Sequence, residues 1–132
     1  MMHSDLYTYL TGTPAIADEF PGGIHHEALP QDVNVWPAMS FFQVSQVEYA
    51  DDMDAPDDDK LDEVQYQFDI VADGSQDALA AADTFLGIFR NFRGTMSATR
   101  VQHVRLTNVS HLGEHRGDKL RRRVSLDFSI IL

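Results

Sequence analysis

The residues best suited to chemistry are six histidines, a dense run of acids and one basic cluster. The histidines are poorly placed to share a metal ion. His25 and His26 are adjacent, so on a strand they point to opposite faces. His103 and His111 would share one face of a strand, but eight residues of extended chain separate them by roughly 26 Å. Because a zinc site needs three or four converging ligands, we expect no metal site and no cofactor.

The acidic run covers residues 51–63 and reads DDMDAPDDDKLDE. A calcium loop that began at Asp52 would place Pro56 at a ligand position and Asp57 where the sharp turn needs glycine. No helical pattern flanks the run, so weak, incidental cation binding is the most that this interpretation supports. We expect a solvated, self-repelling hairpin loop at about residues 50–62. Its acids are Asp51, Asp52, Asp54, Asp57, Asp58 and Asp59.

The basic cluster is DKLRRR, which contains Arg121, Arg122 and Arg123. One interpretation is a nucleic-acid patch, but no aromatic residues stand between the arginines to stack on bases. A subunit contact or a solvated strand edge is the interpretation we favour. Because side chains alternate along a strand, Arg121 and Arg123 would share one face and Arg122 would lie on the other.

Composition limits the class of protein. A chain of 132 residues that is 43% hydrophobic makes one globular domain with a sizeable core. The absence of cysteine excludes disulfides and thiolate metal sites and fits a reducing cytosol. No apolar run is long enough to span a membrane, and no signal peptide is recognisable, so we expect a soluble intracellular protein. The net charge of −11 argues against a dedicated nucleic-acid binder.

The charge is also unevenly distributed along the chain. Residues 1–73 hold sixteen acids against Lys60 alone, whereas residues 74–132 hold five acids and nine bases. Such polarity suits a ring in which the front of one subunit meets the back of the next, although attraction within one subunit would explain it equally well. Aspartate far outnumbers glutamate, a bias typical of proteins from salt-accumulating halophiles. A halophilic host is therefore a hypothesis, which folding in salt-free dilute buffer would contradict.

The apolar pattern predicts the elements that carry these groups. Residues 4–12 form a short helix, and residues 75–93 form a long helix with Ser75 as N-cap and Gly94 beyond its end. Its apolar stripe consists of Ala78, Leu79, Ala82, Phe85, Leu86 and Phe89. Strands are expected near residues 24–30, 38–49, 64–72, 100–112 and 120–132. The fold class is α+β: a single mostly antiparallel sheet of four to five strands, with the long helix packed across it and the short N-terminal helix.

No catalytic signature accompanies this fold. The chain contains no G-x-S-x-G, G-x-x-x-x-G-K-[ST], G-x-G-x-x-G or H-E-x-x-H pattern. No pair of carboxylates or histidines has a spacing that brings it together. We therefore expect that the protein is not an enzyme.

Three segments together resemble the tail-completion family of long-tailed phages, also called tail terminator or tail-to-head joining proteins. They read LPQDVNVWPAMSFFQVS, VQYQFDIVADGSQDALAAADTFLGIF and LRRRVSLDFSIIL, and the resemblance covers nearly the whole chain. It rests on hydrophobic patterns: a short N-terminal helix, a proline-marked segment leading into a strand, a strand-into-helix unit and a closing strand. The long acidic connection departs from the family pattern.

The resemblance implies a structural virion protein made in the host cytoplasm. Such proteins form a ring, usually a hexamer, that caps the tail tube and joins it to the neck of the DNA-filled head. The implied partners are other copies of the chain, the tail tube protein and a neck protein, while DNA passes through the lumen without specific binding. The acidic loop would face the lumen or a partner. The residues expected at the subunit interface are Phe41, Phe42, Arg121, Arg122 and Arg123.

Two other interpretations stay open. One is a different neck component, such as a head-closure or minor capsid protein. The other is a small enzyme or ligand-binding domain with a pocket between sheet and helix.

Overall fold

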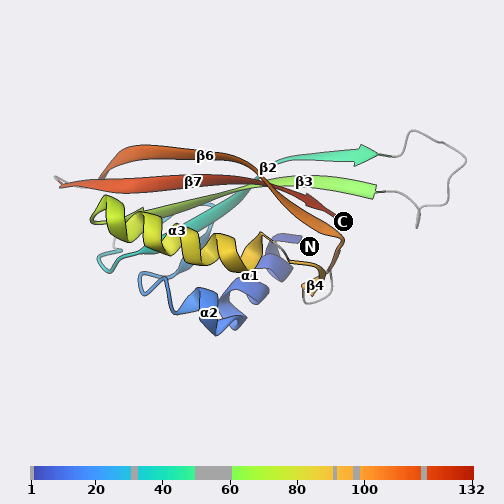
Figure 1. Ribbon diagram of the computed structural model, residues 1–132, viewed down its shortest axis with the longest axis horizontal. Helices are drawn as coiled ribbons and strands as arrows, with labels where there is room; N and C mark the ends of the chain where they lie inside the picture. Colours follow the sequence, from blue (N-terminus) through green and yellow to red (C-terminus); the bar gives the residue numbers. More distant parts are fainter. Residues whose placement is uncertain (1, 31–32, 50–60, 91, 97–98, 117–118) are drawn as a thin grey trace, which may run out of the picture.

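A five-stranded sheet with helices on one face forms the centre of the fold (Figure 1). The computed structural model describes residues 2–30, 33–49, 61–90, 92–96, 99–116 and 119–132. In chain order the elements are α1 (Met2–Gly12), α2 (Pro14–Ala17), β1 (Ile24–His26), β2 (Ala38–Tyr49), β3 (Leu61–Ala72), α3 (Ser75–Phe89), β4 (Gly94–Met96), β5 (Thr99–Val101), β6 (His103–Arg116) and β7 (Lys119–Ile131).

The strand order of the large sheet is β1-β2-β3-β7-β6. Three of its strand pairs are antiparallel, whereas β1 runs parallel to β2, so the sheet is mixed. Strands β4 and β5 form a separate two-stranded hairpin. The predicted α+β class and the mostly antiparallel sheet of four to five strands are confirmed, whereas the expectation of a single sheet is wrong because β4 and β5 pair only with each other. The helix α2 and the β4–β5 hairpin were not predicted, because elements of three or four residues carry too little periodicity to be recognised.

Alternation along β3 defines the two faces of the sheet. Val64, Tyr66, Phe68 and Ile70 are all buried beneath the helices, as their spacing predicted. An aromatic cluster joins the layers: the Phe68 ring centroid lies 5.1 Å from that of Phe85 and 5.5 Å from that of Phe128. The apolar stripe of α3 and the apolar faces of β3 and β7 therefore form one core.

The long helix differs from its prediction at both ends. Gly74, not Ser75, is the N-cap residue, and the helix ends at Phe89 with Arg90 as C-cap. Gly94 begins β4 with a φ of +126° instead of capping the helix. Leu79 was placed on the buried stripe but is 42% exposed. The reason is that α3 packs on β3 and β7, so a side chain directed toward β6 lies beyond the covered part of the sheet.

Two β-bulges change which residues share a face. The register of β6 against β7 shifts between Leu106 and Asn108, so one extra residue reverses the alternation. His103 pairs opposite Ile131 and His111 opposite Val124, which puts the two histidines on opposite faces. The expectation that they share a face is therefore wrong. A second bulge interrupts β2 between Gln43 and Ser45.

Candidate subunit and partner interfaces

The histidines and acids of the described residues do not converge. No group of three or more His, Asp or Glu side chains within these residues could hold a metal ion. The Nε2 atom of His25 lies 3.0 Å from the Gly22 carbonyl oxygen, whereas the His26 ring packs 5.2 Å from the Phe41 ring. No helix in the described part of the chain is long and apolar enough to cross a membrane.

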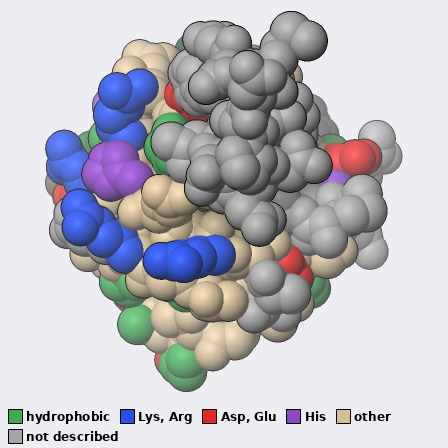
Figure 2. Space-filling view, turned by 90° about the vertical axis from the view of Figure 1, so that its right-hand side faces the viewer, with side chains coloured by type: hydrophobic (Ala, Val, Ile, Leu, Met, Phe, Trp, Pro, Cys, Tyr) green, Lys and Arg blue, Asp and Glu red, His purple; other side chains and the backbone are tan. Residues whose placement is uncertain are grey.

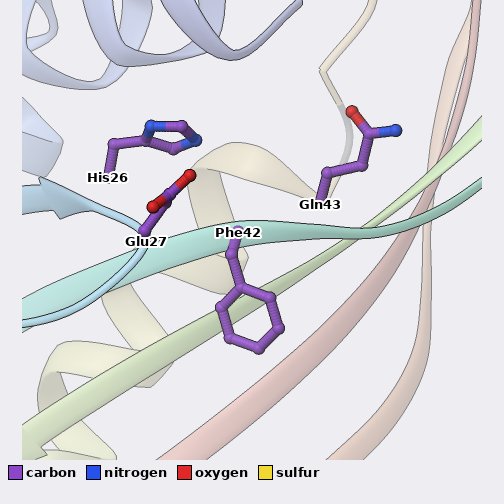
Figure 3. Close-up of a pocket in the computed structure, with 4 residues that line it drawn as sticks. All are labelled: His26, Glu27, Phe42 and Gln43. Carbon is purple, nitrogen blue, oxygen red and sulfur yellow. The ribbon is translucent and has the colours of Figure 1, made fainter.

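A hollow of about 510 Å³ lies at the β1–β2 edge of the sheet, lined by His26, Glu27, Phe42 and Gln43. We refer to it as the β2-edge hollow. Figure 3 shows His26, Glu27 and Gln43 on one side of β2, whereas the Phe42 ring points to the other side. The lining groups therefore surround a strand edge and do not face one another across an enclosed space. Such a hollow suits the edge of another protein better than the reacting atoms of a small substrate.

The two phenylalanines expected at the interface have different environments. Phe41 has no exposed surface and packs against the Tyr66 and Phe68 rings, 6.3 Å and 6.0 Å away. It cannot touch another subunit unless the core opens, so we remove it from the predicted interface. Phe42 is half-buried on the opposite face of β2 and lines the β2-edge hollow. Of the pair, Phe42 alone has surface available for a partner.

The three consecutive arginines are also divided. Arg121 forms an ion pair with Asp73, and its guanidinium lies 4.4 Å from the centre of the Trp36 ring. The Nε atom of Arg123 lies 3.9 Å from an oxygen of Asp69. Two of the arginines therefore hold their own subunit together. Arg122 is exposed on the other face, as the alternation predicted, and is the one available for an outside contact.

Asp69 lies at the centre of a hydrogen-bonded group on the sheet face opposite the helices. Ser125 donates a hydrogen bond of 2.6 Å to it, and the Gln67 amide donates another of 2.9 Å. On the same face Ser129 donates a hydrogen bond to Glu63. Both carboxylates are at least nine-tenths buried. Sequence analysis did not single out Asp69, because the pairing that brings serines of β7 beside acids of β3 is a property of the register.

A basic surface at one end of the molecule was missed by sequence analysis. Figure 1 places the end of α3, the β4 hairpin and the start of β6 together, and Figure 2 shows Lys and Arg side chains beside a histidine at this end. We name this surface the basic end. Its exposed members are Arg90, Arg93, Arg100, His103 and Arg105. None of its arginines forms an ion pair with another described side chain. The sequence does not reveal this cluster, because its four arginines are spread over sixteen residues, from Arg90 to Arg105.

The acidic segment lies outside the described residues, so the predictions for Asp51, Asp52, Asp54, Asp57, Asp58 and Asp59 stay predictions. The flanking strands are known. β2 and β3 pair antiparallel up to Tyr49 and Leu61, so residues 50–60 connect neighbouring ends of one strand pair. This connection is the one that the sequence predicted to be a hairpin loop.

Comparisons with known proteins identify the fold. No protein-family model and no curated protein sequence matches the chain. Among solved structures, a chain from the virion of a native gene transfer agent particle matches with a TM-score of 0.69. The match covers 98% of this chain and 93% of that one at 14% sequence identity. The two chains therefore share a fold over almost their whole length.

Proposed function

We propose that the chain is a structural virion protein of the tail terminator type. It forms a hexameric ring that caps the tail tube and joins the tail to the neck of the DNA-filled head. The observation that carries this proposal is the fold shared with a gene transfer agent virion chain over 98% of the sequence. The hydrophobic patterns that resemble the tail-completion family support the same role independently.

The surfaces of the molecule suit assembly better than catalysis. The β2-edge hollow opens at a strand edge, and the buried acids Asp69 and Glu63 accept hydrogen bonds from serines of β7. Exposed arginines that form no ion pair with another described side chain gather at the basic end. Because charged surfaces steer association and select partners, this end provides a docking surface for an acidic virion component.

The partners follow from the role. A terminator contacts copies of itself, the tail tube protein and a neck protein, and it acts in the virion after synthesis in the host cytoplasm. DNA would pass through the lumen without specific binding, because a surface that carries negative charge forms few contacts with phosphates. Residues 51–59 supply such charge, either toward the lumen or toward a partner.

The proposal is tested by electron microscopy and mass measurement. The purified protein is imaged by negative stain, alone and with tail tubes isolated from particles whose genome encodes it, in low and in molar salt. Light scattering then measures the mass, which for a hexamer is six times the 14.9 kDa of one chain. Rings of this mass, or caps on tube ends, are the expected result.

Two other results would contradict the tail terminator role. Protein that ignores tubes but binds portal-bearing heads would be a head-closure or minor capsid protein. Protein that binds neither tubes nor heads would favour the alternative in which the β2-edge hollow binds a small ligand or a substrate.

A further inference from the structure

Strand β6 forms an open edge of the sheet. It is fourteen residues long, and within the described part of the chain it pairs with β7 alone. The helix layer covers only its start, where Val104 is buried and Leu106 packs against the core, because α3 packs mainly on β3 and β7. A strand of this length with a bare edge is a template for contact with another chain.

This edge is largely polar, but it also exposes large apolar side chains on both faces of the sheet. Val109, 38% exposed, is opposite Leu126 on the helix-covered face, whereas Leu112, 46% exposed, is opposite Arg123 on the other face. Leu79 of α3 is 42% exposed and lines a groove with Leu112. A groove of about 150 Å³ runs between α3 and β6, with Leu79, His111 and Arg122 among its lining residues. Half of the exposed large hydrophobic residues in the described structure are therefore at one edge, the arrangement expected for an interface centre.

The opposite edge of the sheet has a complementary shape. The short strand β1 pairs with β2 only from Met39 to Phe41, so the rest of the outer edge of β2 pairs with no other strand among the described residues. The β2-edge hollow begins there, and Val44, at the bulge just beyond it, is 54% exposed. One edge therefore presents protruding apolar side chains and the other presents a hollow.

The two edges also differ in charge. Strands β1, β2 and β3 hold four of the sixteen acids of residues 1–73, and three of these four are on β3 in the middle of the sheet. The charge difference between the two edges therefore rests on the exposed side chains at each edge. Glu27 is exposed at the hollow, and Arg105 and Arg122 are exposed on either side of Val109. Opposite charges on opposite edges favour head-to-tail contact.

The register places both surfaces at the same level. Cross-strand pairing runs from His26 to Phe41, Phe68, Leu126 and finally Val109, so the hollow and the centre of the β6 edge lie on one rung of the sheet. A contact that joins equal levels of neighbouring subunits adds no step along the strands. Repetition of such a heterologous contact closes a ring when the rotation between neighbours is a whole fraction of a turn, whereas a step would generate a helical filament.

We propose that the β6 edge of one copy, centred on Val109 with Leu79 and Leu112, docks into the β2-edge hollow of the next copy. This inference rests on the proposed ring and specifies which surfaces close it. Arg105 and Arg122 form the basic rim of the contact, and Glu27 belongs to the acidic rim that faces them. Phe42 contributes to the receiving surface, and Arg121, Arg123 and Phe41 do not take part.

The test uses two variants, each of which disables one half of the contact. Val109→Asp puts a charge at the centre of the β6 edge, and Gln43→Arg fills the hollow with a cation that repels the basic rim. Val35→Asp, at a residue 49% exposed that belongs neither to β6 nor to the lining of the β2-edge hollow, is the matched control. Circular dichroism melts establish that each variant folds. Light scattering then measures assembly, in solution and on tail tubes.

Each disabling variant should weaken self-association by about thirty-fold or more, the effect of a central interface residue, while Val35→Asp assembles like the wild type. A mixture of the two variants is more informative. Val109→Asp keeps an intact hollow and Gln43→Arg keeps an intact β6 edge, so one copy of each can pair. The other two surfaces of that pair are disabled, so the mixture should form heterodimers and no larger assemblies. An isologous contact between two β6 edges would instead let Gln43→Arg dimerise alone.

Three results would overturn the inference: assembly of folded Val109→Asp like the wild type, a mixture that stays monomeric, or loss of assembly by the control. In each of these the wild-type ring would still stand, and with it the proposed function. Wild-type protein that forms no ring in solution or on tubes would refute both proposals together.

Discussion

Charge reversal at Arg121 should destabilise the monomer, whereas the same change at Arg122 should not. The Arg121 side chain is 15% exposed, is paired with Asp73 and lies over the ring of Trp36. A largely desolvated cation–π contact contributes about 1–2 kcal/mol, and an ion pair to the half-exposed Asp73 contributes about 0.5–1 kcal/mol. Arg121→Glu removes both and adds repulsion from Asp73. We expect the free energy of unfolding to fall by about 2–4 kcal/mol.

Thermal and urea unfolding followed by circular dichroism measure this loss. For a chain of this size each kcal/mol lowers Tm by about 3–4 °C, so the expected drop is about 6–15 °C. Arg122→Glu is the matched control, since an exposed arginine without an ion pair to a described residue should change stability by less than about 0.5 kcal/mol. Arg121→Met keeps the packing of the aliphatic stem without the charge, and it should lie between the two.

Equal Tm values for Arg121→Glu and Arg122→Glu would refute this reasoning. Such a result would mean that Arg121 makes no net contribution within the subunit. The conclusion that Arg121 and Arg123 stabilise the subunit while Arg122 is available for an outside contact would then be wrong.

Three further changes probe the buried face, the core and the basic end. Ser125→Ala removes a donor from buried Asp69 and should cost about 1–3 kcal/mol in urea unfolding, whereas Ser110→Ala, its half-buried cross-strand neighbour, should cost little. Burial raises the pKa of Tyr66 to about 12, above its ordinary value of 10.0. The folded state therefore holds this proton longer, and stability should fall by at most about 2 kcal/mol as pH rises from 10 to 12; Tyr66→Phe should lose this dependence, and an unchanged alkaline titration would contradict it. Arg93→Glu combined with Arg100→Glu should leave Tm unchanged but lower the salt needed for elution from a heparin column, and unaltered elution would mean that the basic end is not an accessible cationic surface.

The spacing of apolar residues was sufficient to predict the main helices and strands and the packing of a helix on the sheet. The period-two spacing of Val64, Tyr66, Phe68 and Ile70 requires a strand with one apolar face, and the stripe ending at Phe89 requires a helix to cover it. These signals lie within a few residues of one another. The sequence therefore determined the α+β class, the main strands and most of the core, together with the separation of acidic and basic halves.

Register and packing decided the rest. A single extra residue at the β6 bulge moved His111 to the other face, and the position of α3 over β3 and β7 left Leu79 exposed. Apart from Gln67, which lies two residues from Asp69, the partners named above for Arg121 and Asp69 lie on another strand or in a distant connection, and the local sequence does not encode them. Which charged and apolar groups hold the subunit together, and which are left for a neighbour, depends on how strands far apart in sequence come side by side, and only the tertiary structure determines that.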